Sequence, residues 1–563
     1  MKKFKKIVSM ALALVLSFSV VACNNGDTKK TEKTDKTEEK TEENSEKETE
    51  KPADKGDEEQ DEKDPAKEEV KVDLDKNIFS AELDDYKGDG AKLIYHTIGG
   101  VPDDLQLVVD EMNKYTKEHM NVEVDIIFHP YGEYEDQMNL LINTSEEYDL
   151  AFGSAIAGVK DFINQDIFLD LNTVLDKAPN LKALIPDVMW QGVTRSNGEI
   201  FGVPAYKDVA AAQYWVIDKK FVDAYDLDVK NIADFADLTA VFEKVKANPE
   251  KMPEHLNEYP LYLDKGGINS FLFEFENIAN GVGVKFGDTK AINVWADEDA
   301  KAKFKLMAEW YDAGYINPSA NTDEGKEPNS DAIFSAQGWP EAAYGWGNGR
   351  PNGVEVNLRL EPMFTADTIM GSFLVISRAS KHAEAAIKYI ERLNVDKYLR
   401  NLYAYGIEGT HYEKTEKEDV ILQTERGDKQ YNVPSYTQGQ FMNTYVKAAK
   451  VTEENADQYP DLKVGDAILD SANPGQWLSI HENNQNAETS KILGFTFDPE
   501  PVKTELTNLK AVLDKYEAEL FTGAAGVEGL DALLEQIYAE QEAVGIQTVI
   551  DELQKQIDEY LKK

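Results

Sequence analysis

Cysteine is almost absent from this chain, since Cys23 is the only one among its 563 residues. A single thiol forms no internal disulfide, and a zinc site built from pairs of cysteines is excluded for the same reason. Cys23 follows directly behind an apolar segment near the N-terminus, which is a poor position for a catalytic nucleophile. Its role must therefore be explained by its position.

Basic residues are scarce relative to acidic ones. The chain has 60 Lys and Arg against 105 Asp and Glu, which gives a formal net charge of −45. Nucleic-acid binding needs a basic face that neutralises phosphates, and adhesion to anionic lipid headgroups needs a basic patch. We therefore expect no nucleic-acid partner and no membrane contact through surface charge.

The common catalytic and metal-binding motifs are missing. The seven histidines form no HExxH or HxH arrangement, and the chain has no GxSxG elbow and no phosphate-binding loop. The stretch Asp73, Asp75 and Asn77 begins like a calcium loop, but Ile78 stands where that loop needs glycine. We expect no catalytic residue, no metal and no cofactor.

The segment that precedes Cys23 is basic and then apolar. Four lysines among the first six residues and the apolar run over residues 7–18 predict a secretory signal peptide over residues 1–22, too short for a transmembrane span. The stretch Val20-Val21-Ala22-Cys23 resembles a bacterial lipobox, in which the cysteine receives acyl chains such as palmitate and becomes the new N-terminus. The alternative is an ordinary signal peptide with Cys23 incidental.

A long charged segment follows. From residue 24 to about residue 76 the chain consists almost entirely of Lys, Glu, Asp and Thr and has no aromatic residue. Such a segment buries too little apolar surface to offset its ordering entropy. We expect residues 23–78 to be a lipid-anchored, disordered acidic tether that leaves the rest of the chain free to reorient.

Strand-like and helix-like stretches alternate from Ala91 onward. The strands KLIYHTI, VEVDIIFHP and EYDLAFGSA are separated by two amphipathic stretches, a βαβαβ order that predicts a mostly parallel sheet covered by helices. Ligands bind such sheets at the carboxyl ends of the strands. Further along, we expect a helix near residues 300–313, a strand in IMGSFLVIS, a helix around AEAAIKYIERL, and three amphipathic helices from Pro501 to the end.

These features together resemble a known family. The lipobox, the acidic tether, YDLAFGSA, IFGVPAYKD, YWVIDKK and YGIEGTHYE are similar to the extracellular solute-binding lipoproteins of bacterial ABC importers. The C-terminal stretches FTFDPEPVKTELTNLKAVLDKY and GIQTVIDELQKQIDEYLKK resemble the carbohydrate-associated subgroup with an additional C-terminal domain of unknown function.

The resemblance implies an α/β fold of the type II periplasmic-binding-protein kind, with two lobes joined by a hinge and a ligand cleft between them. It implies lobe 1 over residues 91–210 and 370–410, lobe 2 over 211–369, and a largely helical C-terminal region over 411–563 that packs on the lobes. It further implies a monomer, anchored to the outer face of a Gram-positive-like cell membrane through Cys23, that delivers an oligosaccharide to membrane permease subunits.

A sugar site needs carboxylates or amides for hydroxyl pairs and aromatic rings for the apolar faces of the sugar. Polar and aromatic residues on turns, at strand ends and near the expected hinge supply these groups. The predicted ligand-binding residues are Ser154, Tyr206, Lys207, Asp208, Trp339, Trp346, Asn348, Ser372, Glu408, His411 and Trp477. For several of them a structural role is the alternative: core packing for Tyr206, an ion pair for Lys207 and Asp208, and burial for the tryptophans.

Three functional readings remain beside the capture of a carbohydrate. In the first, the chain captures a peptide instead of a carbohydrate. In the second the chain is a surface-anchored glycoside hydrolase, for which Asp208 and Glu408 are the first carboxylate pair to test. In the third it is an adhesive lipoprotein. The sequence identifies neither the sugar nor the permease.

Overall fold

The computed structural model describes residues 71–154, 162–163, 165–347, 349–433, 442–453, 455–456, 459–472 and 474–563. All of them belong to one compact unit, Lys67–Lys563. Cys23, Asn348 and the signal-peptide and tether predictions for residues 1–70 lie outside the described residues.

Lobe 1 is built on a five-stranded sheet with the strand order β4-β3-β5-β14-β6. Its strands are β3 (Ala91–Ile98), β4 (Val122–His129), β5 (Leu150–Gly153), β6 (Val203–Pro204) and β14 (Phe373–Ile376). Strand β3 pairs in parallel with β4 and β5, whereas β14 runs antiparallel to β5 and β6. The predicted βαβαβ opening is confirmed, and the carboxyl ends of β3, β4 and β5 share one edge.

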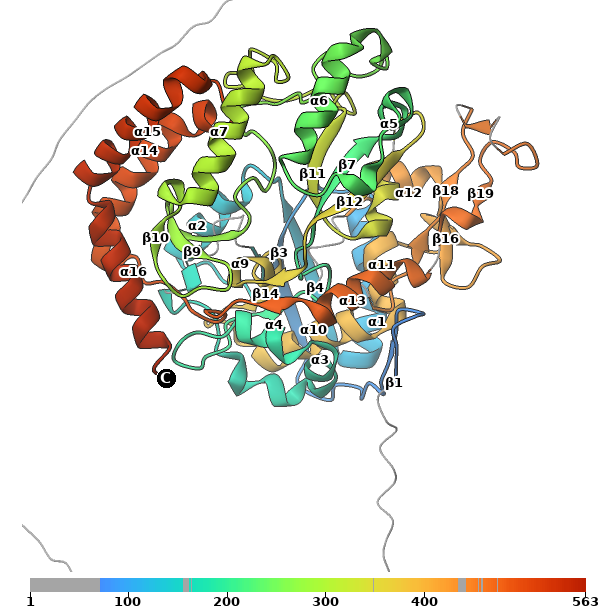
Figure 1. Cartoon of the computed structure of the whole chain (residues 1–563). Helices are drawn as coiled ribbons and strands as arrows, with labels where there is room; N and C mark the ends of the chain where they lie inside the picture. Colours follow the sequence, from blue (N-terminus) through green and yellow to red (C-terminus); the bar gives the residue numbers. More distant parts are fainter. Residues whose placement is uncertain are drawn as a thin grey trace, which may run out of the picture. The chain divides into compact units, whose positions relative to one another are not determined.

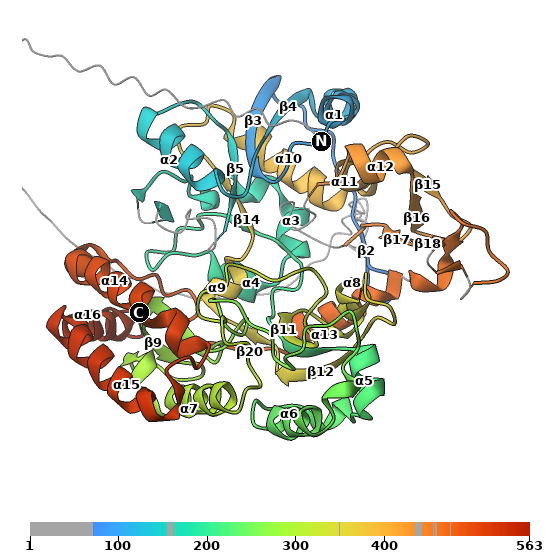
Figure 2. The ribbon, with the colours of Figure 1, turned by 90° about the horizontal axis from the view of Figure 1, so that it is seen from above.

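Helices pack on this sheet to form the core of lobe 1. They are α1 (Leu105–Met120), α2 (Tyr134–Thr144), α3 (Pro179–Leu184), α4 (Asp187–Gly192), α10 (Ala383–Val395) and α11 (Lys397–Tyr405). Helix α1 buries Val108, Val109 and Met112, as their helical spacing predicts. Figure 2 shows these elements gathered around β3, β4 and β5.

Lobe 2 contains two small antiparallel sheets. One has the order β11-β7-β12 and consists of β7 (Gln213–Asp218), β11 (Ile333–Gln337) and β12 (Val354–Leu360). The other has the order β10-β9-β8 and consists of β8 (Phe275–Ala279), β9 (Val282–Lys285) and β10 (Ile292–Asn293). Helices α5 (Lys219–Tyr225), α6 (Asp237–Ala247) and α7 (Glu298–Asp312) pack around a core that includes Trp215, Phe242 and Phe304.

Three segments connect the lobes and are bonded to one another. The backbone N–H of Ala205 donates to the Ser372 carbonyl at 3.0 Å, and that of Ala211 donates to the Met363 carbonyl at 3.1 Å. The third segment contains β20 (Glu488–Thr489), which pairs in parallel with β13 (Met363–Phe364) of the second segment. Strand β13 directly precedes the short helix α9 (Ala366–Ile369). We call these segments, residues 204–212, 361–372 and 484–490, the hinge.

Residues 411–490 are largely irregular and stranded, which corrects the prediction that the whole region 411–563 is largely helical. Their elements are β15 (Tyr412–Lys414), β16 (Val420–Gln423), α12 (Glu425–Gln430), β17 (Val446–Lys447), β18 (Ala449–Lys450), β19 (Ala467–Ile468), α13 (Leu478–Asn486) and β20. Tyr431, Val433 and Met442 are buried in the core of lobe 1. This part of the chain therefore extends lobe 1 beyond the predicted boundary at residue 410.

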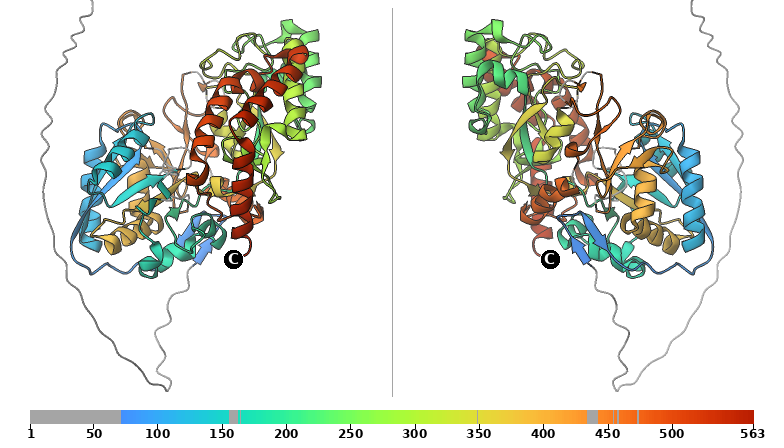
Figure 3. Two further views of the ribbon diagram at one scale, coloured as in Figure 1. Left: turned by 90° about the vertical axis from the view of Figure 1, so that its left-hand side faces the viewer. Right: turned by 90° about the vertical axis from the view of Figure 1, so that its right-hand side faces the viewer.

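The last three helices are α14 (Lys503–Phe521), α15 (Gly526–Ala543) and α16 (Ile546–Tyr560), close to the predicted positions. They pack against lobe 2: Val512, Tyr516 and Leu520 of α14 share a core with Phe304 and Trp310 of α7. Figures 1 and 3 show the three helices side by side along lobe 2. Among the described residues, no helix combines the length and the apolar character that a membrane crossing needs.

An N-terminal hairpin corrects the predicted end of the tether. Strands β1 (Lys71–Asp73) and β2 (Ile78–Ser80) pair antiparallel, although the expected disordered segment includes all of β1 and extends to Ile78. Phe79 is buried in the core of lobe 1, and its N–H donates to Asn443 Oδ1 at 2.9 Å. The hairpin is held by these long-range contacts, which the composition of its own residues does not reveal.

Candidate ligand-binding cleft

A cavity of about 830 Å³ is lined by residues of lobe 1, the hinge, lobe 2 and helix α14. On the lobe 1 side its wall is formed by Ile98 and Phe152, near the ends of β3 and β5, and by Ser154 and Tyr131. The edge formed by the carboxyl ends of the parallel strands is thus the edge that faces the cavity, as the fold class predicts.

The floor of the cavity is formed by hinge residues. Lys207 lines it and forms an ion pair with Asp208, with 2.9 Å between Nζ and Oδ1. Its backbone is fixed by Asn484, whose amide donates to the Lys207 carbonyl at 2.7 Å. Gly371 is also at the cavity, and its carbonyl accepts a hydrogen bond from Ser154 Oγ at 3.0 Å, which ties lobe 1 to the hinge.

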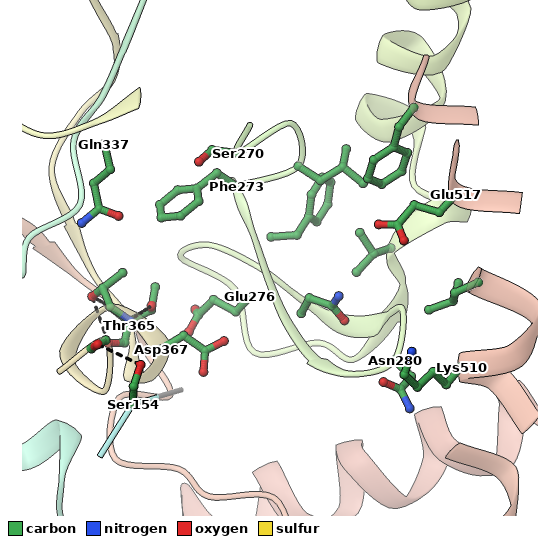
Figure 4. Close-up of a pocket in the computed structure, with 18 of the residues that line it drawn as sticks. Ser154, Ser270, Phe273, Glu276, Asn280, Gln337, Thr365, Asp367, Lys510 and Glu517 are labelled. Carbon is green, nitrogen blue, oxygen red and sulfur yellow. Dashed lines mark hydrogen bonds between the residues drawn. The ribbon is translucent and has the colours of Figure 1, made fainter. Parts of the chain in front are cut away.

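Lobe 2 contributes a wall of aromatic and acidic side chains. Phe273, Trp295 and Glu276 line the cavity, together with Ser270 and Gln337. Figure 4 shows the Glu276 and Asp367 side chains next to each other at the floor, with Phe273 above them. The cavity therefore combines flat apolar surface with hydrogen-bonding groups, which is the composition of a small-molecule site.

Glu276 has an unusual environment for a carboxyl group. Its Oε1 accepts a hydrogen bond from Ser490 Oγ of the hinge at 2.7 Å. Burial raises the pKa of the Glu276 carboxyl to about 7, and the charge of Asp367 acts in the same direction. Near neutral pH this carboxyl is therefore partly protonated, and its protonated form can donate a hydrogen bond as well as accept one.

Helix α14 forms the remaining wall. Lys510, Leu513, Asp514, Glu517 and Phe521 all line the cavity, although they lie within the C-terminal region. No short motif marked them in the sequence. Their only sequence signal is that they lie beside the buried stripe of Val512, Tyr516 and Leu520 on an amphipathic helix.

Among the predicted site residues, the structure brings Ser154 and Lys207 to the cavity and places Asp208 beside Lys207. Tyr206 and Ser372 belong to the hinge and are buried rather than cavity-lining. The Tyr206 hydroxyl and the Ser372 carbonyl instead form hydrogen bonds within and beside the hinge.

The tryptophans predicted to bind the ligand do not line this cavity. Trp346, at the end of helix α8 (Ala343–Trp346), packs with Tyr214 on the face of the β7-β12 sheet, with 6.1 Å between ring centroids. Trp339 and Trp477 pack on each other, with 6.0 Å between ring centroids. The two tryptophans of the glycine-rich loop therefore pack on other parts of the protein, and neither lines the cavity.

Glu408 and His411 are also separate from the cavity. Glu408 is exposed and forms an ion pair with Lys414 at 2.8 Å. His411 is fully buried, and its Nε2 lies 3.1 Å from Asp104 Oδ2. This contact holds residues 411–433 against helix α1 of lobe 1. Asp208 and Glu408 each pair with a different lysine, and the structure does not assemble them into a two-carboxylate glycosidase site.

Among the residues that the structure describes, no group of three or more His, Cys, Asp or Glu side chains is arranged to hold a metal ion.

Several cavity residues were not predicted from the sequence. They include Phe273, Glu276, Asp367 and Glu517, and they come from segments without a recognisable motif. The alternation of aromatic and acidic residues in FLFEFEN, residues 271–277, is the one local pattern that marks part of this wall.

Comparison with known proteins gives two family matches. Residues 100–399 match the model described as bacterial extracellular solute-binding protein, and residues 491–562 match a domain of unknown function. A protein of Streptococcus pneumoniae serotype 4, described as a carbohydrate ABC transporter substrate-binding protein, is 25% identical over 489 residues, which cover 84% of this chain and 92% of that protein.

Solved structures with a similar fold include the N-glycan transport solute binding protein NgtS of Streptococcus pneumoniae. Its crystal structure is 21% identical and superposes with a TM-score of 0.69, covering 84% of this chain and 99% of that chain. The structure of NgtS in complex with Man5GlcNAc is 23% identical with a TM-score of 0.60, covering 84% of this chain and 99% of that chain. These likenesses establish the two-lobed type II fold for this chain.

Proposed function

The chain belongs to the bacterial extracellular solute-binding protein family, and from this premise we propose that it captures an oligosaccharide between its lobes and delivers it, unaltered, to the permease of an ABC importer. The carbohydrate relative in Streptococcus pneumoniae, which aligns over most of both chains, supports the choice of ligand class. The observation that carries the proposal is the cavity shared by lobe 1, the hinge, lobe 2 and α14.

The chemistry of that cavity suits a sugar. Phe273 offers flat apolar surface, and Ser270, Gln337 and Glu276 offer hydrogen-bonding groups on the same wall, whereas Trp295 is almost fully buried in the core of lobe 2. A sugar ring presents apolar C–H faces and an equatorial set of hydroxyls, so it uses both kinds of group at once. The cavity volume of about 830 Å³ lies within the range of sites that hold ligands of more than one ring.

Hinge closure supplies the mechanism of capture. The lobes are connected through short hydrogen-bonded segments, and a ligand that touches both lobes stabilises the closed arrangement by its differential contacts. Lys207 and Gly371 of the hinge line the cavity, so ligand contacts and the hinge geometry are directly coupled.

We also propose that the protein acts without catalysis and at the outer face of the cell membrane. The relatives are solute-binding proteins, which supports a role in binding. The lipobox-like stretch ending at Cys23 and the charged segment behind it support an acyl anchor and a tether that keep the cleft near its permease.

A thermal-shift screen tests this function. Purified protein lacking residues 1–66 is melted with neutral oligosaccharides, monosaccharides and short peptides, because a ligand of the folded state raises the melting temperature with the logarithm of its concentration. We expect an oligosaccharide to stabilise the protein and to be recovered intact. Stabilisation by peptides alone would overturn the carbohydrate assignment, and cleaved sugar would establish an enzyme.

A further inference from the structure

We infer that helix α14, within the C-terminal domain of unknown function, is a ligand-contacting wall of the cleft and that this wall selects uncharged over anionic glycans. The inference rests on the proposed function and assigns a role to the C-terminal domain. It follows from how α14 is seated, from one carboxylate that its neighbours leave unpaired, and from the balance of charge around the cavity.

The two faces of α14 have different surroundings. Val512, Tyr516 and Leu520 are buried in the core of lobe 2. Leu513, Glu517 and Phe521 follow at intervals of four residues, so they form a neighbouring stripe, and all three line the cavity. The helix is therefore anchored by one face and presents the other to the ligand space.

Close contacts fix α14 against the loops of lobe 2. Asn280 donates to the carbonyl of Leu506 at 2.9 Å. A Cβ atom on Gly281 would lie 3.3 Å from the Leu513 side chain, and one on Gly267 would lie 2.9 Å from the Phe521 carbonyl. Gly267 also has a φ of 69°, in the left-handed region that favours glycine. These contacts preorganise the wall before a ligand arrives.

Glu517 is the charged group of this wall that has no protein partner among the described residues. Its neighbour Asp514 pairs with Lys510 at 2.7 Å. Among the described residues, the exposed Glu517 carboxylate makes neither a hydrogen bond nor an ion pair, and partial desolvation together with the charge of Asp514 raises its pKa. Figure 4 shows Glu517 extending from α14 toward the side of the cavity that carries Phe273. When a ligand fills the cavity and displaces water from Glu517, a ligand hydroxyl that donates to this carboxylate would avoid leaving the acceptor unpaired.

The charges around the cavity favour an uncharged ligand. Four carboxyl groups line it, on Glu276, Asp367, Asp514 and Glu517. The two lysines of the lining, Lys207 and Lys510, each form an ion pair with a neighbouring carboxylate. Within the part of the chain that the structure describes, a uronate or sialate group entering the cavity would therefore meet repulsion without a free counter-ion. Neutral hydroxyls instead donate to the carboxylates.

Calorimetric titration of the protein with Man5GlcNAc, maltotetraose, cellotetraose and the anionic probe trigalacturonate tests the inference. We expect at least one neutral glycan to bind, and trigalacturonate to bind at least ten-fold more weakly than the best of them. Glu517→Gln should weaken the tightest neutral glycan about 3- to 10-fold. Glu519→Gln, the same charge change at a partly buried position of α14 that does not line the cavity, should stay within two-fold of the wild type.

The outcomes separate the two proposals. Absence of binding by every glycan overturns the proposed function and this inference with it. Binding of a neutral glycan with equal affinity by the wild type and Glu517→Gln overturns the role of α14 alone. If trigalacturonate binds more tightly than every neutral glycan, the selection against anionic glycans is overturned, whereas the proposed capture of carbohydrates is retained. Equal melting temperatures of the two variants establish that the comparison is made between folded proteins.

Discussion

The Tyr206 hydroxyl and the Nδ1 atom of His481 lie 2.8 Å apart, and this contact joins two hinge-proximal segments far apart in the chain. On the other side of the ring, Nε2 of His481 lies 3.1 Å from Asn77 Oδ1 of the N-terminal hairpin. Because an amide oxygen only accepts, Nε2 carries the proton and Nδ1 accepts from the tyrosine. Tyr206 is thus a positioning residue for the hinge.

Tyr206→Phe should lower the free energy of unfolding by about 1–2 kcal/mol, because it leaves a buried imidazole nitrogen without its donor. Chemical denaturation of the two proteins measures the difference. Tyr398→Phe is the control, since Tyr398 is 50% exposed and its hydroxyl is not needed to pair a buried group. A Tyr206→Phe protein as stable as the wild type would contradict the assigned role.

Glu276 makes the stability of the protein depend on pH near neutrality. The carboxyl of the unfolded chain loses its proton near pH 4.5 and that of the folded chain near pH 7, so the folded state holds more protons between these values. The contribution of Glu276 to stability is therefore fully present below pH 4.5 and is lost as the pH rises through 7.

Glu276→Gln should remove this dependence. We expect the variant to be more stable than the wild type at pH 8 and to differ little from it at pH 4.5, as measured by melting temperature across the pH range. Glu341→Gln, on the Trp339 loop outside the cavity, serves as the matched substitution. Parallel pH profiles for the wild type and Glu276→Gln would show that the carboxyl titrates normally.

Trp346 and Phe273 should separate stability from binding. Trp346 packs on the β7-β12 sheet, so Trp346→Ala should cost about 1–3 kcal/mol of stability through lost packing and leave glycan affinity within two-fold. Phe273 is half-buried and lines the cavity, so Phe273→Ala should weaken glycan binding with a smaller loss of stability. Calorimetry and denaturation of both variants check the assignment, which fails if Trp346→Ala is the weaker binder.

Cys23→Ser should abolish acylation at that position. Cells producing the variant should release the protein into the medium or accumulate it unprocessed, as fractionation and mass spectrometry of the N-terminus would show. Asn24→Ser changes the neighbouring residue and should leave the protein in the membrane fraction. A Cys23→Ser protein that still fractionates with membranes in its mature form would disprove the anchor.

Local patterns predicted much of the fold. The period-two burial of β4, with Val122, Val124 and Ile126 inside, and the buried stripe of α1 are both visible in the order of apolar residues. The three C-terminal helices were placed by the same reasoning. Ser154 and Lys207 were predicted for the site because Ser154 follows the end of a strand and Lys207 follows a proline bend. In this class of fold such positions lie near the ligand.

The sequence by itself determined the acidic, cysteine-poor character of this protein and many of its longer helices and strands, because these depend on composition or on spacing between near neighbours. The two-lobed class was implied by the resemblance to a known family. Only the tertiary structure decided that Glu517 of α14 shares a cavity with Glu276 and Lys207, and that Trp346 packs on a sheet instead. The physical reason is that side chains meet in a cavity through packing between distant segments. Even when the apolar stripe of a helix is known, the sequence does not show which of several protein surfaces that stripe packs against.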